Sequence, residues 1–125
     1  MVTTEERLLE LVRKLNEYRY VVGSESTFQA GVELVLQKYG IAYIREFDLG
    51  REFGRIDFYL PHSGTGLELK VKGSPSDVAR QLYRYCLSPE IAGLVLLTSR
   101  NRLARMPQAM NGKPLLSVSL SWGNV

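Results

Sequence analysis

Apolar residues recur every three or four positions in three segments of the chain, a spacing that places them along one face of a helix. The first segment predicts a helix from Thr3 to about Tyr18, with Thr3 and Glu6 as a capping box. The second predicts a helix from about Glu25 to Tyr39, ended by Gly40. The third predicts a helix from Pro75 to about Leu87, with Ser74 as its N-cap. The faces expected to be buried consist of Leu8, Leu11, Val12 and Leu15, then Phe28, Val32, Val35, Leu36 and Tyr39, then Val78, Leu82, Tyr85 and Cys86.

Alternating or continuous apolar runs between and after these helices predict strands. The predicted strands are Ile41 to Phe47, Arg55 to Leu60, Gly66 to Lys72, Ile91 to Thr98 and Leu115 to Leu120. The fourth run is almost wholly apolar, as expected for a strand that is covered on both faces. The order of elements predicts an α/β (α+β) fold, with a mixed sheet of about five strands flanked by helices and an extra helix at the N-terminus.

A chain of 125 residues fits a single domain. We expect a helical extension in residues 1–22, a central unit in residues 24–98, and a loop and strand in residues 99–125. A hydrophobic fraction of 45% and a charged fraction of 23% are typical of a folded globular protein. No apolar run reaches the roughly 20 residues that span a bilayer, and the N-terminal segment is charged. We therefore expect no membrane partner and a cytoplasmic location.

The single cysteine and the single histidine restrict the chemistry. Cys86 has no partner within the chain for a disulfide, and His62 and Cys86 together are too few for a His/Cys zinc cage. His62 lies in a turn rich in proline, serine and glycine, which disfavours a Ser-His-Asp or Cys-His mechanism. The net charge of +3 mildly favours a polyanionic partner.

The strands on either side of the Pro61 to Thr65 turn can be aligned by their apolar residues, because a slip of one residue would exchange their faces. The alignment puts three residues of the first strand on one face with two of the second: Ile56, Phe58, Leu60, Leu67 and Leu69. The other face then carries Arg55, Asp57, Tyr59, Glu68, Lys70 and Lys72. With the turn centred on His62-Ser63, Asp57 lies directly opposite Glu68.

Two carboxylates that face each other on neighbouring strands repel, unless a cation or a shared proton offsets the repulsion. Oxygen ligands suit Mg²⁺ or Mn²⁺, which polarise a phosphoryl oxygen and activate water. Lys70 shares the face of Glu68 and could orient that water or stabilise charge on a phosphate. The spacing alone is equally consistent with the solvated face of an ordinary hairpin, in which these charges form weak surface pairs.

These residues resemble the PD-(D/E)XK nuclease superfamily, whose signature is an Asp at the end of one strand and an acid-x-Lys triplet on the next. The matching segments are Gly54-Arg55-Ile56-Asp57 and Glu68-Leu69-Lys70, with Ile56 in place of the usual proline. Gln81 and Tyr85 are similar to a Gln-x-x-x-Tyr pattern on the following helix of RecB-like members. Ser24-Glu25 with Gln29 and Gly40 resembles the first helix of VRR-NUC members, and small Holliday-junction resolvases share this order of elements.

The resemblance implies a restriction-endonuclease-like fold and a Mg²⁺- or Mn²⁺-dependent DNA nuclease. It implies Asp57, Glu68 and the carbonyl of Leu69 as metal ligands, with Lys70 beside the attacking water and Gln81 orienting Lys70 or that water. It also implies an acid on the first helix of the core that assists in binding the metal or the water. That acid is Glu25 or Glu33, and helical geometry favours Glu25, which falls inside the apolar arc that faces the sheet.

Several further residues are candidates for contact with nucleic acid. The candidates are Gln29, Arg55, Lys72, Arg80 and Arg84. A solvated basic surface explains the arginines and Lys72 at least as well, and the same applies to Arg100, Arg102 and Arg105.

Two alternatives to a DNA nuclease stay open at this point. The chain could be a nucleic-acid-binding or assembly module that keeps the fold without the chemistry, or it could cleave RNA. A homodimer through the N-terminal helix or the last strand would enlarge the surface around a duplex. The sequence leaves open endo- or exonucleolytic cleavage, the preferred DNA structure or sequence, and the biological pathway.

Overall fold

A six-stranded mixed sheet forms the centre of the structure, a computed structural model that describes residues 1–21 and 23–120. The strands are β1 (Ile44–Asp48), β2 (Arg55–Leu60), β3 (Thr65–Lys70), β4 (Gly93–Thr98), β5 (Ala109–Met110) and β6 (Lys113–Ser119), in the order β1-β2-β3-β4-β6-β5. The β1–β2, β2–β3 and β5–β6 pairs are antiparallel, and β3, β4 and β6 are parallel. The expected α/β fold with a mixed sheet is therefore confirmed.

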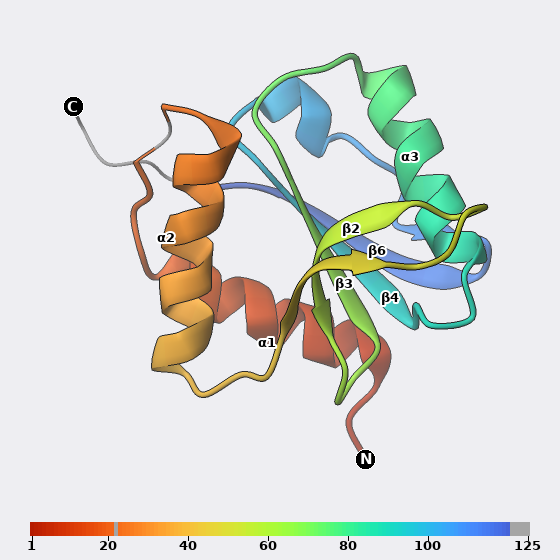
Figure 1. Ribbon diagram of the computed structural model, residues 1–125, viewed down its shortest axis with the longest axis horizontal. Helices are drawn as coiled ribbons and strands as arrows, with labels where there is room; N and C mark the ends of the chain where they lie inside the picture. The colour runs from red at the N-terminus through yellow and green to blue at the C-terminus, as the bar shows by residue number, and fades with distance from the viewer. Residues whose placement is uncertain (22, 121–125) are drawn as a thin grey trace.

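Helices cover both faces of this sheet (Figure 1). The helices α1 (Thr4–Asn16) and α2 (Glu25–Lys38) lie on one face, and α3 (Pro75–Leu87) and the short 3₁₀ helix η1 (Asn101–Ala104) lie on the other. Serine or threonine hydroxyls accept a hydrogen bond at each α-helix start, from Glu6, Thr27 and Asp77 respectively. Within residues 1–21 and 23–120, the structure contains no helix with the length and apolarity needed to cross a bilayer.

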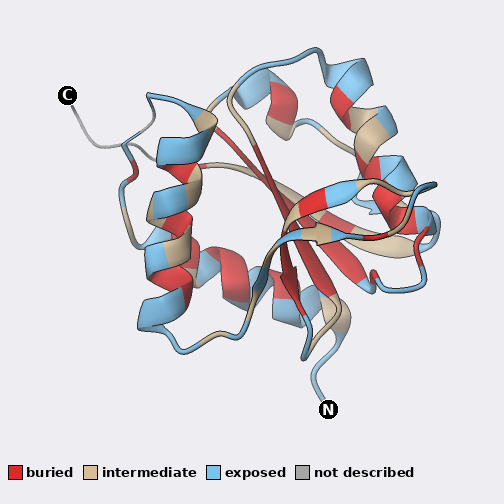
Figure 2. Cartoon of the chain, in the orientation of Figure 1, coloured by how far each residue is buried: buried red, intermediate tan, exposed pale blue. Residues whose placement is uncertain are grey.

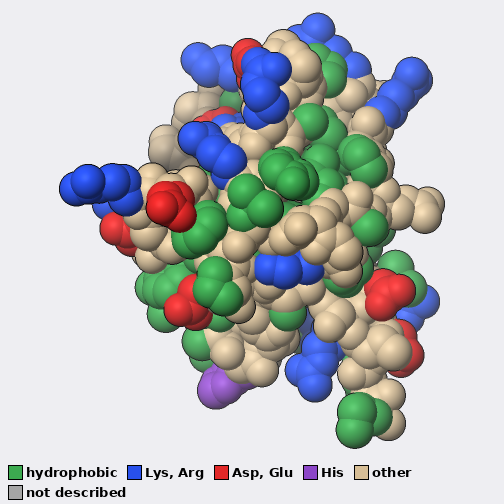
Figure 3. Space-filling view, turned by 90° about the vertical axis from the view of Figure 1, so that its right-hand side faces the viewer, with side chains coloured by type: hydrophobic (Ala, Val, Ile, Leu, Met, Phe, Trp, Pro, Cys, Tyr) green, Lys and Arg blue, Asp and Glu red, His purple; other side chains and the backbone are tan. Residues whose placement is uncertain are grey.

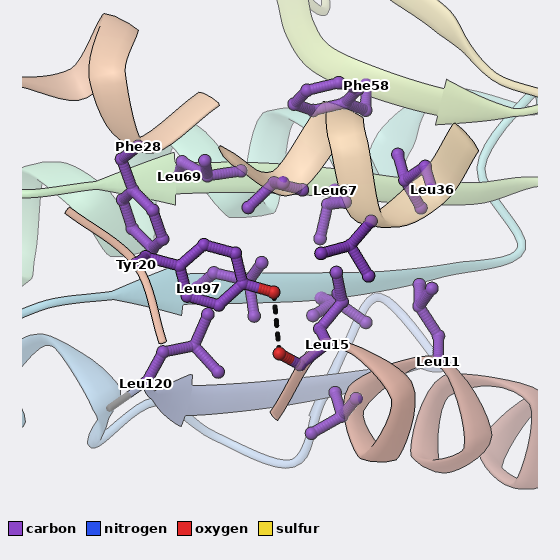
Figure 4. Packing of buried hydrophobic residues seen from close by; sticks show 14 of the residues in the cluster. Leu11, Leu15, Tyr20, Phe28, Leu36, Phe58, Leu67, Leu69, Leu97 and Leu120 are labelled. Carbon is purple, nitrogen blue, oxygen red and sulfur yellow. Dashed lines mark hydrogen bonds between the residues drawn. The ribbon is translucent and has the colours of Figure 1, made fainter. Parts of the chain in front are cut away.

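The first core cluster lies between the sheet and α1 and α2. Both helices contribute the apolar residues that their spacing predicts, except Tyr39, which is exposed. Figure 4 shows four of them, Leu11, Leu15, Phe28 and Leu36, near Phe58, Leu67, Leu69 and Leu97 of the sheet. The buried hydroxyl of Tyr20 donates to the carbonyl of Leu15 over 2.6 Å, so this aromatic residue is buried without an unsatisfied polar group. Helix α1 is thus an integral part of the packed core.

The second core cluster lies between the sheet and α3. Its sheet residues include Ile56, Tyr59, Leu94 and Leu96, which pack against Val78, Leu82, Tyr85 and Cys86 of the helix. Gly66 lies beneath this cluster, and a Cβ atom there would come within 2.5 Å of the Ile56 side chain. Figure 2 shows that burial is nearly continuous along the central strands. The two clusters sandwich β3 and β4, which explains why their side chains are almost all buried.

Several strand limits differ from those expected, each for a local reason. β1 begins at Ile44, because the amide of Ile41 donates to Leu36 O in the C-terminal cap of α2, beside Gly40 at φ 65°. β3 ends at Lys70, because the next carbonyl, of Val71, accepts from the Arg100 side chain. β6 begins at Lys113 because it pairs with β5. The sequence pattern did not indicate β5 or η1.

The expected position of Ile56 is wrong. Ile56 packs in the second cluster, whereas Phe58 and Leu60 pack in the first. The neighbouring strand β1 shows the same exchange of faces, because Arg45 lies 4.9 Å from the Phe58 ring while Phe47 packs in the second cluster. The residue between them, Glu46, has a left-handed φ of 50°. The side chains of both strands therefore change faces of the sheet, at Glu46 in β1 and at Asp57 in β2.

Candidate active site

The candidate site lies where β2 and β3 separate. Regular pairing between these strands ends at Phe58 and Leu67, and Asp57 and Glu68 are the next residues in this register. The Asp57 amide donates to Glu68 Oε1 over 3.1 Å, and the Leu69 amide donates to Asp57 Oδ2 over 2.9 Å. Each carboxylate thus accepts a hydrogen bond from the backbone of the other strand. These two bonds take the place of backbone hydrogen bonds between β2 and β3, and they hold both acidic side chains between the separating strands.

Glu68 is buried and in contact with two further groups of the site. Its side chain is only 4% exposed, and Lys70 Nζ lies 3.5 Å from Oε2. The Tyr85 hydroxyl lies 3.2 Å from the same oxygen. The ammonium group offsets part of the charge of this carboxylate, and at 20% side-chain exposure it remains accessible to a ligand.

Burial and mutual repulsion raise the pKa values of both acids. Burial raises the pKa of Glu68 to about 8, with a further contribution from Asp57, and Lys70 and two hydrogen bonds only partly oppose the shift. The pKa of Asp57 is raised by burial first, an effect that the Leu69 amide opposes. The charges of Glu25 and Glu46 also raise the Asp57 pKa. The raised pKa values show that the two ionised carboxylates are unfavourable beside each other in this buried place, and a bound cation would stabilise their charged forms.

Helix α3 supplies a chain of hydrogen bonds to the site. The Tyr85 hydroxyl donates to the Arg55 carbonyl over 2.8 Å and lies within reach of Glu68, and Gln81 Nε2 donates to the Tyr85 hydroxyl over 2.8 Å. Gln81 therefore contacts Tyr85 and does not orient Lys70 directly. Tyr85, expected mainly as a core residue, is both buried in the core and in contact with the site. Burial and the nearby carboxylates raise its pKa, so this hydroxyl stays protonated.

Helix α2 offers two acids, and they lie in different surroundings. Glu33 Oε1 accepts from Arg45 over 2.8 Å, and Glu33 Oε2 accepts from Tyr43 over 2.6 Å. Both oxygens of Glu33 are therefore engaged with β1 and the residues before it. Glu25, at the start of the helix, is half-buried, and its charge acts on Asp57. Of the two acids, Glu25 is therefore the one whose charge acts on the site.

Gln29, one turn after Glu25, is also engaged within the protein. Its side-chain oxygen accepts from the Arg45 guanidinium over 2.9 Å. Arg45 thereby joins Gln29 to Glu33 and holds α2 against β1. The expected contact of Gln29 with nucleic acid would have to use its amide NH₂ group.

No three histidine, cysteine, aspartate or glutamate side chains converge on one point in residues 1–21 and 23–120. A metal ion at this site would therefore be held by Asp57 and Glu68, supplemented by the Leu69 carbonyl and by water or substrate. Mg²⁺ fits such a set, because it commonly binds through one or two carboxylates and keeps several waters. Glu25 would act from a greater distance than these ligands.

The four basic residues predicted to contact nucleic acid are all exposed. Arg55 and Lys72 flank the site residues on β2 and after β3, and both are exposed. Arg80 and Arg84 lie on the exposed side of α3, where Arg80 pairs with Asp77. None of these four side chains contacts Asp57, Glu68 or Lys70 through a hydrogen bond or ion pair in the described part of the chain.

Sequence reasoning missed Glu46 as a neighbour of the site. It lies between the β1–β2 pairs that flank Asp57, and its charge acts on that carboxyl group. Its left-handed backbone is unusual for a glutamate, and no pattern in the sequence signals it.

Compared with models of protein families, with curated proteins and with solved structures, the chain has no match.

Proposed function

We propose that this protein is a Mg²⁺- or Mn²⁺-dependent nuclease of the PD-(D/E)XK type that hydrolyses phosphodiester bonds in DNA. The observation that carries the proposal is the pair of crossed hydrogen bonds between Asp57 and Glu68, with Lys70 3.5 Å from the second acid. Each carboxylate accepts a hydrogen bond from the other strand, but burying two negative charges side by side still costs free energy unless a cation neutralises them. A divalent cation satisfies that requirement with the ligand chemistry available.

The proposed reaction needs a water molecule, a phosphodiester and a bound cation. Mg²⁺ at the two carboxylates and the Leu69 carbonyl would supply Lewis-acid polarisation of the phosphate and lower the pKa of water. The water oxygen forms a bond to phosphorus, the phosphorus–oxygen ester bond breaks, and a proton from the water ends on the leaving oxygen, which becomes a hydroxyl group. In this proposal, Lys70 donates a hydrogen bond to the attacking water or to a phosphate oxygen, where negative charge increases.

The other polar groups position these residues. The Tyr85 hydroxyl and the Asp57 amide hold Glu68 in one orientation, and Gln81 holds the Tyr85 hydroxyl. Glu25 approaches from the start of α2 and adds negative charge beside Asp57. Positioning of this kind contributes to catalysis because the reacting groups need no reorganisation.

The proposal includes a cytoplasmic location and DNA as the partner, with branched or otherwise structured DNA as a candidate substrate. A homodimer remains part of it, because a chain of this size covers little of a duplex. The edge of β6 is paired with β5 only at Lys113 and Pro114, so an interface there would form beyond this short pair. α1 is available through its exposed side, including Leu9 at 43% exposure.

The test is cleavage of end-labelled single-stranded, duplex and four-way-junction DNA by the purified protein, with Mg²⁺ and with EDTA. We expect cleavage only with the metal, and we expect Lys70→Ala to lower the rate by at least about 100-fold. Lys14→Ala is the matched control. Lys14 is also a half-buried lysine, but it lies on α1 and pairs with Glu10 of the same helix.

Three outcomes separate the candidates. Metal-dependent cleavage that is lost in Lys70→Ala and kept in Lys14→Ala supports the proposal. Binding of DNA without cleavage would favour a non-catalytic module with this fold. Cleavage of RNA but not DNA under the same conditions would retain the mechanism and change the substrate.

A further inference from the structure

The charges of this chain are unevenly divided along the sequence. Half of the 16 basic residues, but only two of the 13 acidic ones, lie at or after Lys70. The two acids are Asp77 and Glu90. The segment that follows the catalytic lysine is therefore strongly basic, although the whole chain carries a net charge of only +3.

Five of these basic residues lie on α3 and on the segment of residues 100–105, and all five are exposed; we call them the basic face: Arg80, Arg84, Arg100, Arg102 and Arg105. Arg100 Nε donates to the Val71 carbonyl over 3.0 Å, and Arg102 donates to the Gly73 carbonyl over 3.4 Å. These bonds hold the start of η1 against the loop that follows Lys70. Figure 1 shows η1 beside the start of α3, and several Lys and Arg side chains lie at this upper end in Figure 3.

A groove continues from this end along α3. It has a volume of about 940 Å³, and it lies between one side of the helix and residues 107–111. Arg80, Gln81 and Arg84 line the groove, together with Tyr83, which is 48% exposed. Gln81 also donates to Tyr85, which contacts Glu68. The groove and the candidate active site therefore share one side chain.

We propose that the basic face and this groove bind the phosphate backbone of the DNA strand on one side of the cleaved bond. Among the five arginines, only Arg80 has a carboxylate partner in residues 1–21 and 23–120, namely Asp77. Guanidinium groups bind phosphate through paired hydrogen bonds, and clustered unpaired arginines repel one another until a polyanion neutralises them. The exposed Tyr83 offers a ring on which a base can stack. The inference rests on the proposed function for its choice of ligand.

The test measures binding apart from cleavage. Fluorescence anisotropy with a short labelled DNA duplex and its single strand, in EDTA and over a range of salt concentrations, gives the affinity and its salt dependence. The variant is Arg84→Gln with Arg105→Gln, because neither side chain makes a hydrogen bond or ion pair in the described residues. The control is Arg7→Gln with Arg19→Gln, which removes the same charge from exposed positions on and after α1.

We expect the first pair to weaken duplex binding about tenfold and to reduce the magnitude of the salt slope by about 2, since each lost phosphate contact lowers it by about 0.9. The control pair should change both quantities much less. Equal losses in the two double variants, or no loss in either, would overturn the inference. A protein that binds DNA through this face and does not cleave it would refute the proposed function and leave the binding surface intact.

Discussion

The buried acid of the site leads to a prediction about stability. Glu68 is 3% exposed, and its pKa is raised from 4.5 to about 8. A carboxyl group with a raised pKa in the folded state leaves the protein most stable below its unfolded pKa, and stability is lost as pH rises through the folded value. The wild-type protein should therefore lose stability between pH 4.5 and pH 8 through this residue.

Glu68→Gln removes the charge and keeps an oxygen that can accept from the Asp57 amide. The pKa difference between 4.5 and about 8 sets an upper limit of roughly 5 kcal/mol for the gain in stability above pH 8. Relaxation and water penetration reduce such penalties, so we expect a gain of about 2 kcal/mol. This corresponds to a rise in melting temperature on the order of 8 °C for a domain of this size.

Thermal unfolding at pH 5 and pH 8.5, with and without Mg²⁺, measures the effect. The glutamine variant should match the wild type at the lower pH and exceed it at the higher one. Mg²⁺ should stabilise the wild type more than the variant, because an ion that binds only the folded state adds stability. Glu52→Gln is the control, since Glu52 is exposed in the β1–β2 turn. If the wild type and Glu68→Gln respond to pH in parallel, or if the variant is less stable at pH 8.5, the reasoning about this carboxyl group is wrong.

Three further substitutions test other parts of the structure. Gly66→Ala should lower the unfolding free energy by about 1 to 3 kcal/mol in chemical denaturation, because its Cβ would meet the Ile56 side chain at 2.5 Å; an unchanged midpoint would contradict this packing. Tyr85→Phe removes the hydroxyl that donates to the Arg55 carbonyl and lies beside the buried Glu68 carboxyl group, and should cost about 1 to 3 kcal/mol. The cleavage rate per folded molecule should fall as well. Glu25→Gln should slow cleavage, whereas Glu33→Gln should mainly lower the melting temperature because it weakens the ion pair that holds α2 to β1; the reverse pattern would assign the assisting acid to Glu33.

Much of the fold could be predicted because local signals and burial agree. Helix α3 illustrates this agreement: Ser74 caps it, Pro75 begins it, and the apolar positions that its spacing predicts are buried. The continuous apolar run that forms β4 is buried at every position. In both cases, the residues that form the element are also the residues that pack it.

The errors occur where the backbone departs from regular alternation. A strand pattern assumes that every second residue shares a face, and the left-handed conformation of Glu46 breaks that rule for β1 while β2 turns over beside it. Regular alternation therefore places Ile56 on the wrong face. That Asp57 lies across from Glu68 could be predicted from the turn between β2 and β3. The turn sets which residues of the two strands face each other, whichever side of the sheet their side chains occupy.

The parts of the site that could not be predicted depend on long-range contacts. Tyr85 is 17 residues from Glu68 in sequence and reaches it only because α3 packs across the sheet. The network that engages Glu33 joins α2 to Tyr43 and Arg45, and no spacing within one element signals it. Such contacts follow from how the layers pack, so they appear only in three dimensions.

The most direct test of the central claim is the position of a bound Mn²⁺ ion, located by its anomalous scattering in crystals of the wild-type protein. The account predicts one strong peak coordinated by carboxylate oxygens of Asp57 and Glu68, and no peak there in crystals of Asp57→Asn. Mn²⁺ bound only elsewhere, or an empty site at saturating Mn²⁺, would contradict the claim that these two acids form a metal centre.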